Sequence, residues 1–205
     1  MDSPIFIVFQ FVVLIFSVII HEIAHGFMAL KLGDETAKDA GRLTLNPISH
    51  IDPIGSIILP LLMFMIGSPI LLGWAKPVPY NPLNLHKDPK YGPLKVALAG
   101  PLSNLGLAVL FGLFIRFGFG LVPQQTLGLL SIIVLLNCVL FVFNMLPIPP
   151  LDGSKVLTTF LPFKYAIRFE RMGFNGLIII LLFLTFFPGL IFDLAKGLST
   201  LIVGA

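Results

Sequence analysis

Charged residues are scarce in this chain of 205 residues, which contains 13 Lys and Arg residues and 10 Asp and Glu residues. They make up 11% of the sequence, whereas soluble globular domains carry about 25%. Hydrophobic residues make up 57%. This composition excludes an ordinary soluble domain. The net charge of only +3 gives no basis for nucleic-acid binding.

Cysteine is also scarce, because Cys138 is the single one and excludes an intrachain disulfide. It lies within an apolar run, so we interpret it as a small core residue. The sequence lacks internal repeats, polar linkers and low-complexity segments, which favours one membrane-embedded domain over residues 1–205. Residues 1–4 contain no basic region and no small-residue cleavage site follows, so we expect no cleaved signal peptide.

Long apolar runs, by contrast, are abundant, and they predict an all-α polytopic protein of the cell membrane. We expect four transmembrane helices, over residues 4–32, 94–121, 127–146 and 176–194. A further hydrophobic segment, residues 55–73, is divided by Pro60 and by Gly67-Ser68-Pro69. Basic residues flank it on both sides, so the positive-inside tendency favours a re-entrant segment with both flanking loops in the cytosol. The alternative is five full spans.

Two polar segments are expected to be extended. Arg42–Asn46 alternates polar and apolar residues, which predicts a short β-strand. Three prolines exclude helix from Lys76–Pro82, which fits an extended edge or a loop.

The segment His21-Glu22-Ile23-Ala24-His25 has the pattern H-E-x-x-H at the end of the first apolar run. Residues four apart share one helix face, so both imidazoles can reach one metal ion. Glu22 is close enough to act as general base on a water molecule at that ion. The alternative is that Glu22 pairs with a lysine while the histidines bond to the backbone. Unpaired ionisable groups are costly at membrane depth, so we prefer one catalytic zinc ion per chain.

A third ligand is required, and three residues are candidates. His50 and His86 lie in loops and could serve. Asp152 is better placed, because the prolines of residues 147–150 end the third span and Gly153 permits a tight turn after the carboxylate. The alternative is that Asp152 caps the N-terminus of a following helix. We predict that Asp152 is the ligand.

Six segments resemble the site-2 protease family of intramembrane zinc metalloproteases: HEIAHGFMALKLG, GRLTLNP, HIDPIG, GWAKPVPYNP, ALAGPLSN and NMLPIPPLDG. The resemblance covers about residues 18–155. The chain is most similar to the compact prokaryotic members of the family, which lack a PDZ or CBS domain. It implies zinc binding by His21, His25 and Asp152. It also implies that Glu22 activates water.

The resemblance implies roles for two asparagines as well. Asn144 would face the reaction centre, where its amide could stabilise an oxyanion or hold the substrate carbonyl. The alternative is a hydrogen bond between helices. Asn104 belongs to another family motif, for which substrate binding and helix packing both remain open.

The function that the resemblance implies is hydrolysis of peptide bonds in or near transmembrane segments. Single-span membrane proteins would be the substrates, within the lipid bilayer, and the active site would face the cytosol. A substrate helix must unwind before cleavage, so we expect it to pair with Arg42–Asn46 or with Lys76–Asn81. The alternatives are a membrane metal transporter and a non-proteolytic zinc-binding membrane protein.

Overall fold

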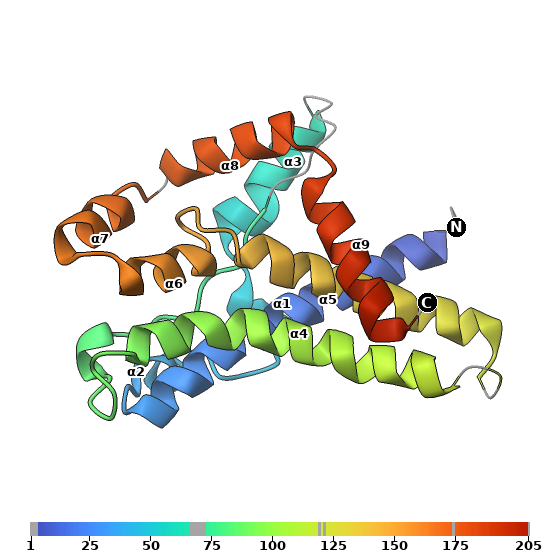
Figure 1. Ribbon diagram of the computed structural model, residues 1–205, viewed down its shortest axis with the longest axis horizontal. Coiled ribbons are helices and arrows are strands. Elements are labelled where there is room, and N and C mark those ends of the chain that lie inside the picture. Colours follow the sequence, from blue (N-terminus) through green and yellow to red (C-terminus); the bar gives the residue numbers. More distant parts are fainter. Residues whose placement is uncertain (1–3, 66–72, 119, 121, 174, 205) are drawn as a thin grey trace.

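The computed structural model describes residues 4–65, 73–118, 120, 122–173 and 175–204 (Figure 1). Within these ranges the protein is helical and contains no β-strand. In the described part of the chain, three continuous helices are long and apolar enough to cross a membrane, namely α1 (Pro4–Leu32), α4 (Gly92–Gly118) and α5 (Gln124–Asn144). They confirm the first three predicted spans.

The remaining helical elements are shorter. In chain order they are α2 (Thr36–Asp39), the 3-10 turn η1 (Pro47–His50), the π-helical turn η2 (Pro53–Ile58), α3 (Leu59–Met65), the 3-10 turn η3 (Pro82–Asn84), α6 (Asp152–Phe160), α7 (Phe163–Glu170), α8 (Asn175–Phe186) and α9 (Leu190–Val203).

The fourth predicted span, residues 176–194, is not one continuous helix. It is divided into α8 and α9 by a break that contains Pro188 and Gly189. Proline lacks the backbone N–H of a helix interior, so the helix ends before it. The 12 residues of α8 rise about 18 Å, less than the ~30 Å of a bilayer core. The structure therefore does not confirm residues 176–194 as a single span, although α7 and α8 together are long and apolar enough to form one bent span.

The predicted strand at Arg42–Asn46 is also wrong, because local hydrogen bonds use its backbone groups. The Arg42 N–H donates to the Ala37 carbonyl at 2.9 Å, which continues the end of α2. The Asn46 N–H donates to the Thr44 hydroxyl at 3.2 Å, and the Asn46 side chain caps η1. Side-chain bonds of this kind compete with sheet ladders.

The two ends of the hydrophobic segment at residues 55–73 lie together. The Trp74 N–H donates to the Gly55 carbonyl at 3.2 Å, and the Ser56 hydroxyl donates to the Trp74 carbonyl at 2.8 Å. The indole also packs where a side chain on Gly55 would lie. Residues 66–72, in the middle of the predicted re-entrant segment, lie outside the described residues.

Helix α4 packs against four other helices, α1, α5, α6 and α9, and runs along the lower edge of the view in Figure 1. Small residues let its neighbours approach closely, as at Gly112, where an added Cβ would overlap Ile202 of α9. Buried apolar side chains of α4, α5 and α9 form one core cluster. A second cluster joins Ala29 and Leu32 of α1 to Val96 of α4, so α4 packs against the half of α1 that carries the two histidines.

Candidate metal centre

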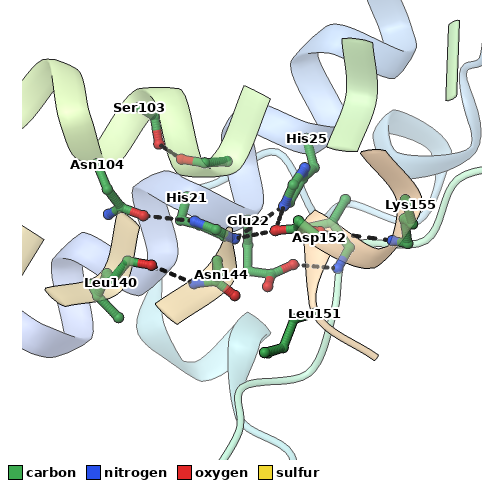
Figure 2. A network of polar contacts seen from close by, with 12 residues as sticks. His21, Glu22, His25, Ser103, Asn104, Leu140, Asn144, Leu151, Asp152 and Lys155 are labelled. Atoms are coloured by element: carbon green, nitrogen blue, oxygen red, sulfur yellow. Dashed lines mark hydrogen bonds and ion pairs between the residues drawn. The ribbon is translucent and has the colours of Figure 1, made fainter. Parts of the chain in front are cut away.

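The structure brings together His21, His25 and Asp152, which are distant in sequence (Figure 2). The two Nε2 atoms are 3.0 Å apart, and Asp152 Oδ2 lies 3.1 Å from each. All three side chains are buried. Three ligands of a tetrahedral zinc ion with bonds of 2.0–2.1 Å would be separated by about 3.3 Å, so the spacing is close to that of a zinc site.

One face of α4 supports the two imidazoles. Val96, Gly100 and Asn104 recur every four residues along this face. The Val96 carbonyl accepts a hydrogen bond from His25 Nδ1 at 2.6 Å, and Asn104 Oδ1 accepts one from His21 Nδ1 at 2.7 Å. Gly100 lies between them, where an added Cβ would overlap both imidazoles. A glycine is therefore required for α4 to approach the site.

The donor set fits a cation. A neutral imidazole that donates through Nδ1 has a lone pair on Nε2. The lone pairs of His21 and His25 then face each other and the Asp152 carboxylate at about hydrogen-bond distance, which is favourable only around a positive charge. Outer hydrogen bonds at Nδ1 are also the usual arrangement for zinc-binding histidines. Among the described residues, this is the one group of three potential ligands close enough to share an ion.

Asp152 reaches the cluster as the first residue of α6. The helix N-cap is Leu151, without a side-chain cap, so the alternative of Asp152 as the cap does not hold. Gly153 packs against the carbonyls of Met145 and Leu146, where an added Cβ would overlap both. Its role is close approach rather than the tight turn expected from sequence. Lys155 Nζ lies 3.8 Å from the second carboxylate oxygen, Oδ1.

Glu22 lies beside the cluster, and the segment after Trp74 holds its carboxylate. The backbone N–H of Val78 donates to Glu22 Oε2 at 2.8 Å. Arg42 fixes this segment from the other side, because its guanidinium donates to the carbonyls of Lys76 at 2.6 Å and Pro77 at 3.4 Å. The bond to Val78 uses only Oε2, so it holds the carboxylate in place without involving the other oxygen, Oε1.

Asp34 anchors the next part of that segment and was not identified from sequence. It is fully buried and accepts hydrogen bonds from the Asn81 backbone at 2.6 Å and the Asn84 side chain at 3.1 Å. Burial raises the pKa of Asp34, but its hydrogen bonds with Thr36, Asn81 and Asn84 outweigh burial and lower the pKa below its ordinary value. The carboxylate therefore remains charged. In the sequence, the only indication of this role is the position of Asp34 directly after Gly33, the residue that follows α1.

The two predicted asparagines differ in their surroundings. The Asn144 amide is half-buried near the end of α5 and donates to the Leu140 carbonyl of its own helix at 3.0 Å (Figure 2). This bond is not the helix–helix contact considered as the alternative. Asn104 is fully buried, and both ends of its amide bond to protein atoms. Such an amide offers no group to a substrate.

Sequence reasoning also missed Ser17 and Asn137. Both are buried and connect to Asn104. Asn137 lies in the middle of an apolar span, and a polar side chain at that depth needs a partner. The energetic cost of an unpaired asparagine in a membrane span could have indicated that Asn137 has a polar partner. It does not identify that partner.

No model of a known protein family matches the chain. No solved structure matches it either. The chain is similar to YwhC of Bacillus subtilis, provisionally named a zinc metalloprotease, with 40% identity over 183 residues that cover 85% of this chain and 79% of YwhC. Rip2 of Mycobacterium tuberculosis, also provisionally named a zinc metalloprotease, is 33% identical over 69% of this chain and 52% of its own length. Zinc metalloprotease MJ0392 of Methanocaldococcus jannaschii is 27% identical over 80% of this chain and 38% of its own length.

An H-E-x-x-H motif on a long apolar helix, with a carboxylate beside it, defines a metalloprotease class of membrane protein. The extent of the similarity to YwhC shows that the chain belongs to the site-2 protease family of zinc metalloproteases. The names of these relatives do not favour the transporter alternative.

Proposed function

We propose that this zinc metalloprotease hydrolyses peptide bonds in or near the transmembrane segments of single-span membrane proteins. The observation that carries the proposal is the depth of the metal cluster. His25 and His21 lie 7 and 11 residues before Leu32, or about 10 and 17 Å from the end of α1. A cluster at that depth lies within the span of its helix, where a substrate helix can reach it.

The active site faces the cytosol in this proposal. Most of the basic residues lie at the histidine end of α1 and α4, in the loops there or in the adjoining helix turns: Lys31, Lys38, Arg42, Lys76, Lys87, Lys90 and Lys95. Basic loops stay preferentially on the cytosolic side. The hydrogen bonds of Trp74 with Gly55 and Ser56 support a re-entrant segment, because the ends of a full span would be separated by about 30 Å.

Glu22 is the general base and then the general acid of the proposed mechanism. The N–H of Val78 orients the carboxylate, and Oε1 takes a proton from the attacking water. Glu22 then delivers that proton to the leaving nitrogen. His21, His25 and Asp152 would hold zinc, which polarises the scissile carbonyl and lowers the pKa of water when bound.

Asn144 remains the candidate for contact with the substrate carbonyl. That role requires its Nδ2 to exchange the Leu140 carbonyl for the substrate oxygen. Of the two segments expected to pair with an unwound substrate, we favour Lys76–Asn81. It lies beside the proposed base, because Val78 contacts Glu22 directly.

The bond from Val78 to Glu22 can be tested by removing its hydrogen. Val78→Pro lacks the N–H, so we expect proteolysis to fall by about tenfold or more, because one hydrogen bond to a charged group contributes roughly 1.5–3 kcal/mol. Zinc content should be unchanged. Val78→Ala retains the N–H and is the matched control for lost packing. If both variants lost the same activity, orientation of Glu22 by this bond would be refuted.

The proposed function is tested by mapping where the enzyme cuts. Zinc-loaded protein in liposomes is incubated with a panel of single-span proteins, and the new termini are identified by mass spectrometry. We expect cuts within or next to the transmembrane segments. Cuts confined to soluble regions, with intact transmembrane segments, would show an ordinary membrane-bound endopeptidase instead.

A further inference from the structure

A buried polar network extends from His21 away from the metal cluster and connects the three spanning helices. Its members are Ser17 on α1, Asn104 on α4 and Asn137 on α5. The two asparagines have no exposed surface, and Ser17 is 4% exposed. Polar side chains at this depth are costly unless every group is satisfied, so the arrangement of their hydrogen bonds is informative.

Backbone carbonyls fix the direction of each amide in this network, because a carbonyl only accepts hydrogen bonds. Asn137 Nδ2 donates to the Ile133 carbonyl at 2.9 Å and to the Ser17 hydroxyl at 3.0 Å. Asn137 Oδ1 therefore faces Asn104 and accepts from its Nδ2 at 3.0 Å. The same Nδ2 also donates to the Ser17 carbonyl at 3.3 Å. Asn104 Oδ1 is consequently directed at His21.

This direction decides which nitrogen of His21 carries the hydrogen. Asn104 Oδ1 accepts from Nδ1 at 2.7 Å, so Nδ1 is protonated and Nε2 presents a lone pair to the cluster. If the Asn104 amide turned over, its NH₂ group would face Nδ1 and favour the opposite tautomer. The hydrogen would then lie on Nε2, where it prevents metal binding.

We propose that Asn137 is a positioning residue that, together with the Ser17 carbonyl, fixes the orientation of the Asn104 amide and so keeps His21 in the zinc-binding tautomer. This inference rests on the metal site of the proposed function. Its mechanism requires no contact between Asn137 and the metal or the substrate. The competing explanation is that the network only holds the three helices together, which is a common role of polar residues in membrane bundles.

Zinc affinity of the purified protein, measured by competition with a chelator, separates the two explanations. Loss of an outer hydrogen-bond partner typically weakens metal binding about 10- to 100-fold, and we expect Asn137→Ala to fall in this range. Val134→Ala is the matched control, because Val134 is fully buried on the same helix and outside the network. It should lower thermal stability and leave zinc affinity unchanged.

A second-site change provides the decisive comparison. In Asn104→Asp, both ends of the side chain are acceptors, so His21 Nδ1 finds an acceptor in either orientation. The double variant with Asn137→Ala should therefore recover most of the zinc affinity, although Asn137 is still missing. A residue that only holds helices together would not be replaced in this way.

Three outcomes would overturn the proposal: wild-type zinc affinity in Asn137→Ala, an equal loss in Val134→Ala, or no recovery in the double variant. If the variants do not fold, the wild-type protein still provides a test. The chain contains four histidines, so ring ¹⁵N spectra of metal-free, histidine-labelled protein can be assigned. We expect the hydrogen of His21 on Nδ1, and finding it on Nε2 would refute the proposal. Because these readouts measure zinc and tautomer, a failure to cut transmembrane segments would leave them interpretable.

Discussion

Replacing Glu22 by glutamine should abolish most of the proteolysis while the protein keeps its zinc. The amide retains the size of the side chain, and its oxygen still accepts from Val78. It does not accept a proton from water at neutral pH, so the general base is lost. Removing such a group typically reduces the rate about 10²- to 10⁴-fold. The measurement is the single-turnover cleavage rate of a single-span substrate, together with the zinc content of the same preparation.

The matched control for this variant is Glu35→Gln. Glu35 is an exposed acid whose partner is Lys38, at 3.2 Å, and it contacts none of the cluster residues. The change should leave the cleavage rate at the wild-type value. Equal cleavage by wild type and Glu22→Gln would reject Glu22 as the base. Loss of zinc from Glu22→Gln would instead indicate that Glu22 supports the metal site.

Replacing Asp152 by alanine should remove the zinc itself. Two imidazoles would remain, and the buried site would lose the negative charge that compensates the cation. Loss of an outer partner typically costs about 10- to 100-fold in metal affinity, so we expect loss of a direct ligand to cost more than about 100-fold. The measurement is zinc content after dialysis against a weak chelator, with cleavage activity measured in parallel.

Two surface residues provide controls of matched chemistry. Asp88 precedes α4 and pairs with Lys95 in its first turn at 2.6 Å, and His86 is an exposed loop histidine. Asp88→Ala and His86→Ala should retain zinc and activity. A full zinc content in Asp152→Ala would exclude this carboxylate as a ligand and return the search to the remaining acids and histidines.

The sequence predicted the elements whose physics is local. Apolar runs longer than a bilayer core indicated α1, α4 and α5, because such runs satisfy their backbone only as helices. The four-residue spacing of His21 and His25 placed both on one helix face. Predictions were less successful where nearby groups interrupt a regular pattern, either by accepting backbone hydrogen bonds or by ending a helix. Arg42–Asn46 alternates like a strand, but the Ala37 carbonyl and the Thr44 hydroxyl accept its backbone hydrogen bonds, and Pro188 divides the last apolar run.

The hydrogen-bond partners of Asn104 also could not be read from the sequence. Its motif was compatible with substrate binding and with packing, and neither describes an amide that bonds to His21. The contribution of Asn137 depends on the position of α5 relative to α1 and α4. A hydrogen bond between residues that are 33 or 120 positions apart leaves no periodic pattern.

By itself, therefore, the sequence determined which chemical groups this membrane-embedded chain carries: two imidazoles and a carboxylate on one helix turn, and a second carboxylate after a proline-rich end. These properties follow from residue type and from spacing within one element. Only the tertiary structure decided that the second carboxylate reaches the imidazoles, that a glycine of α4 makes room for them, and that an asparagine on α5 directs the amide behind His21. The physical reason is that helix packing sets distances between side chains of different elements, whereas sequence separation does not.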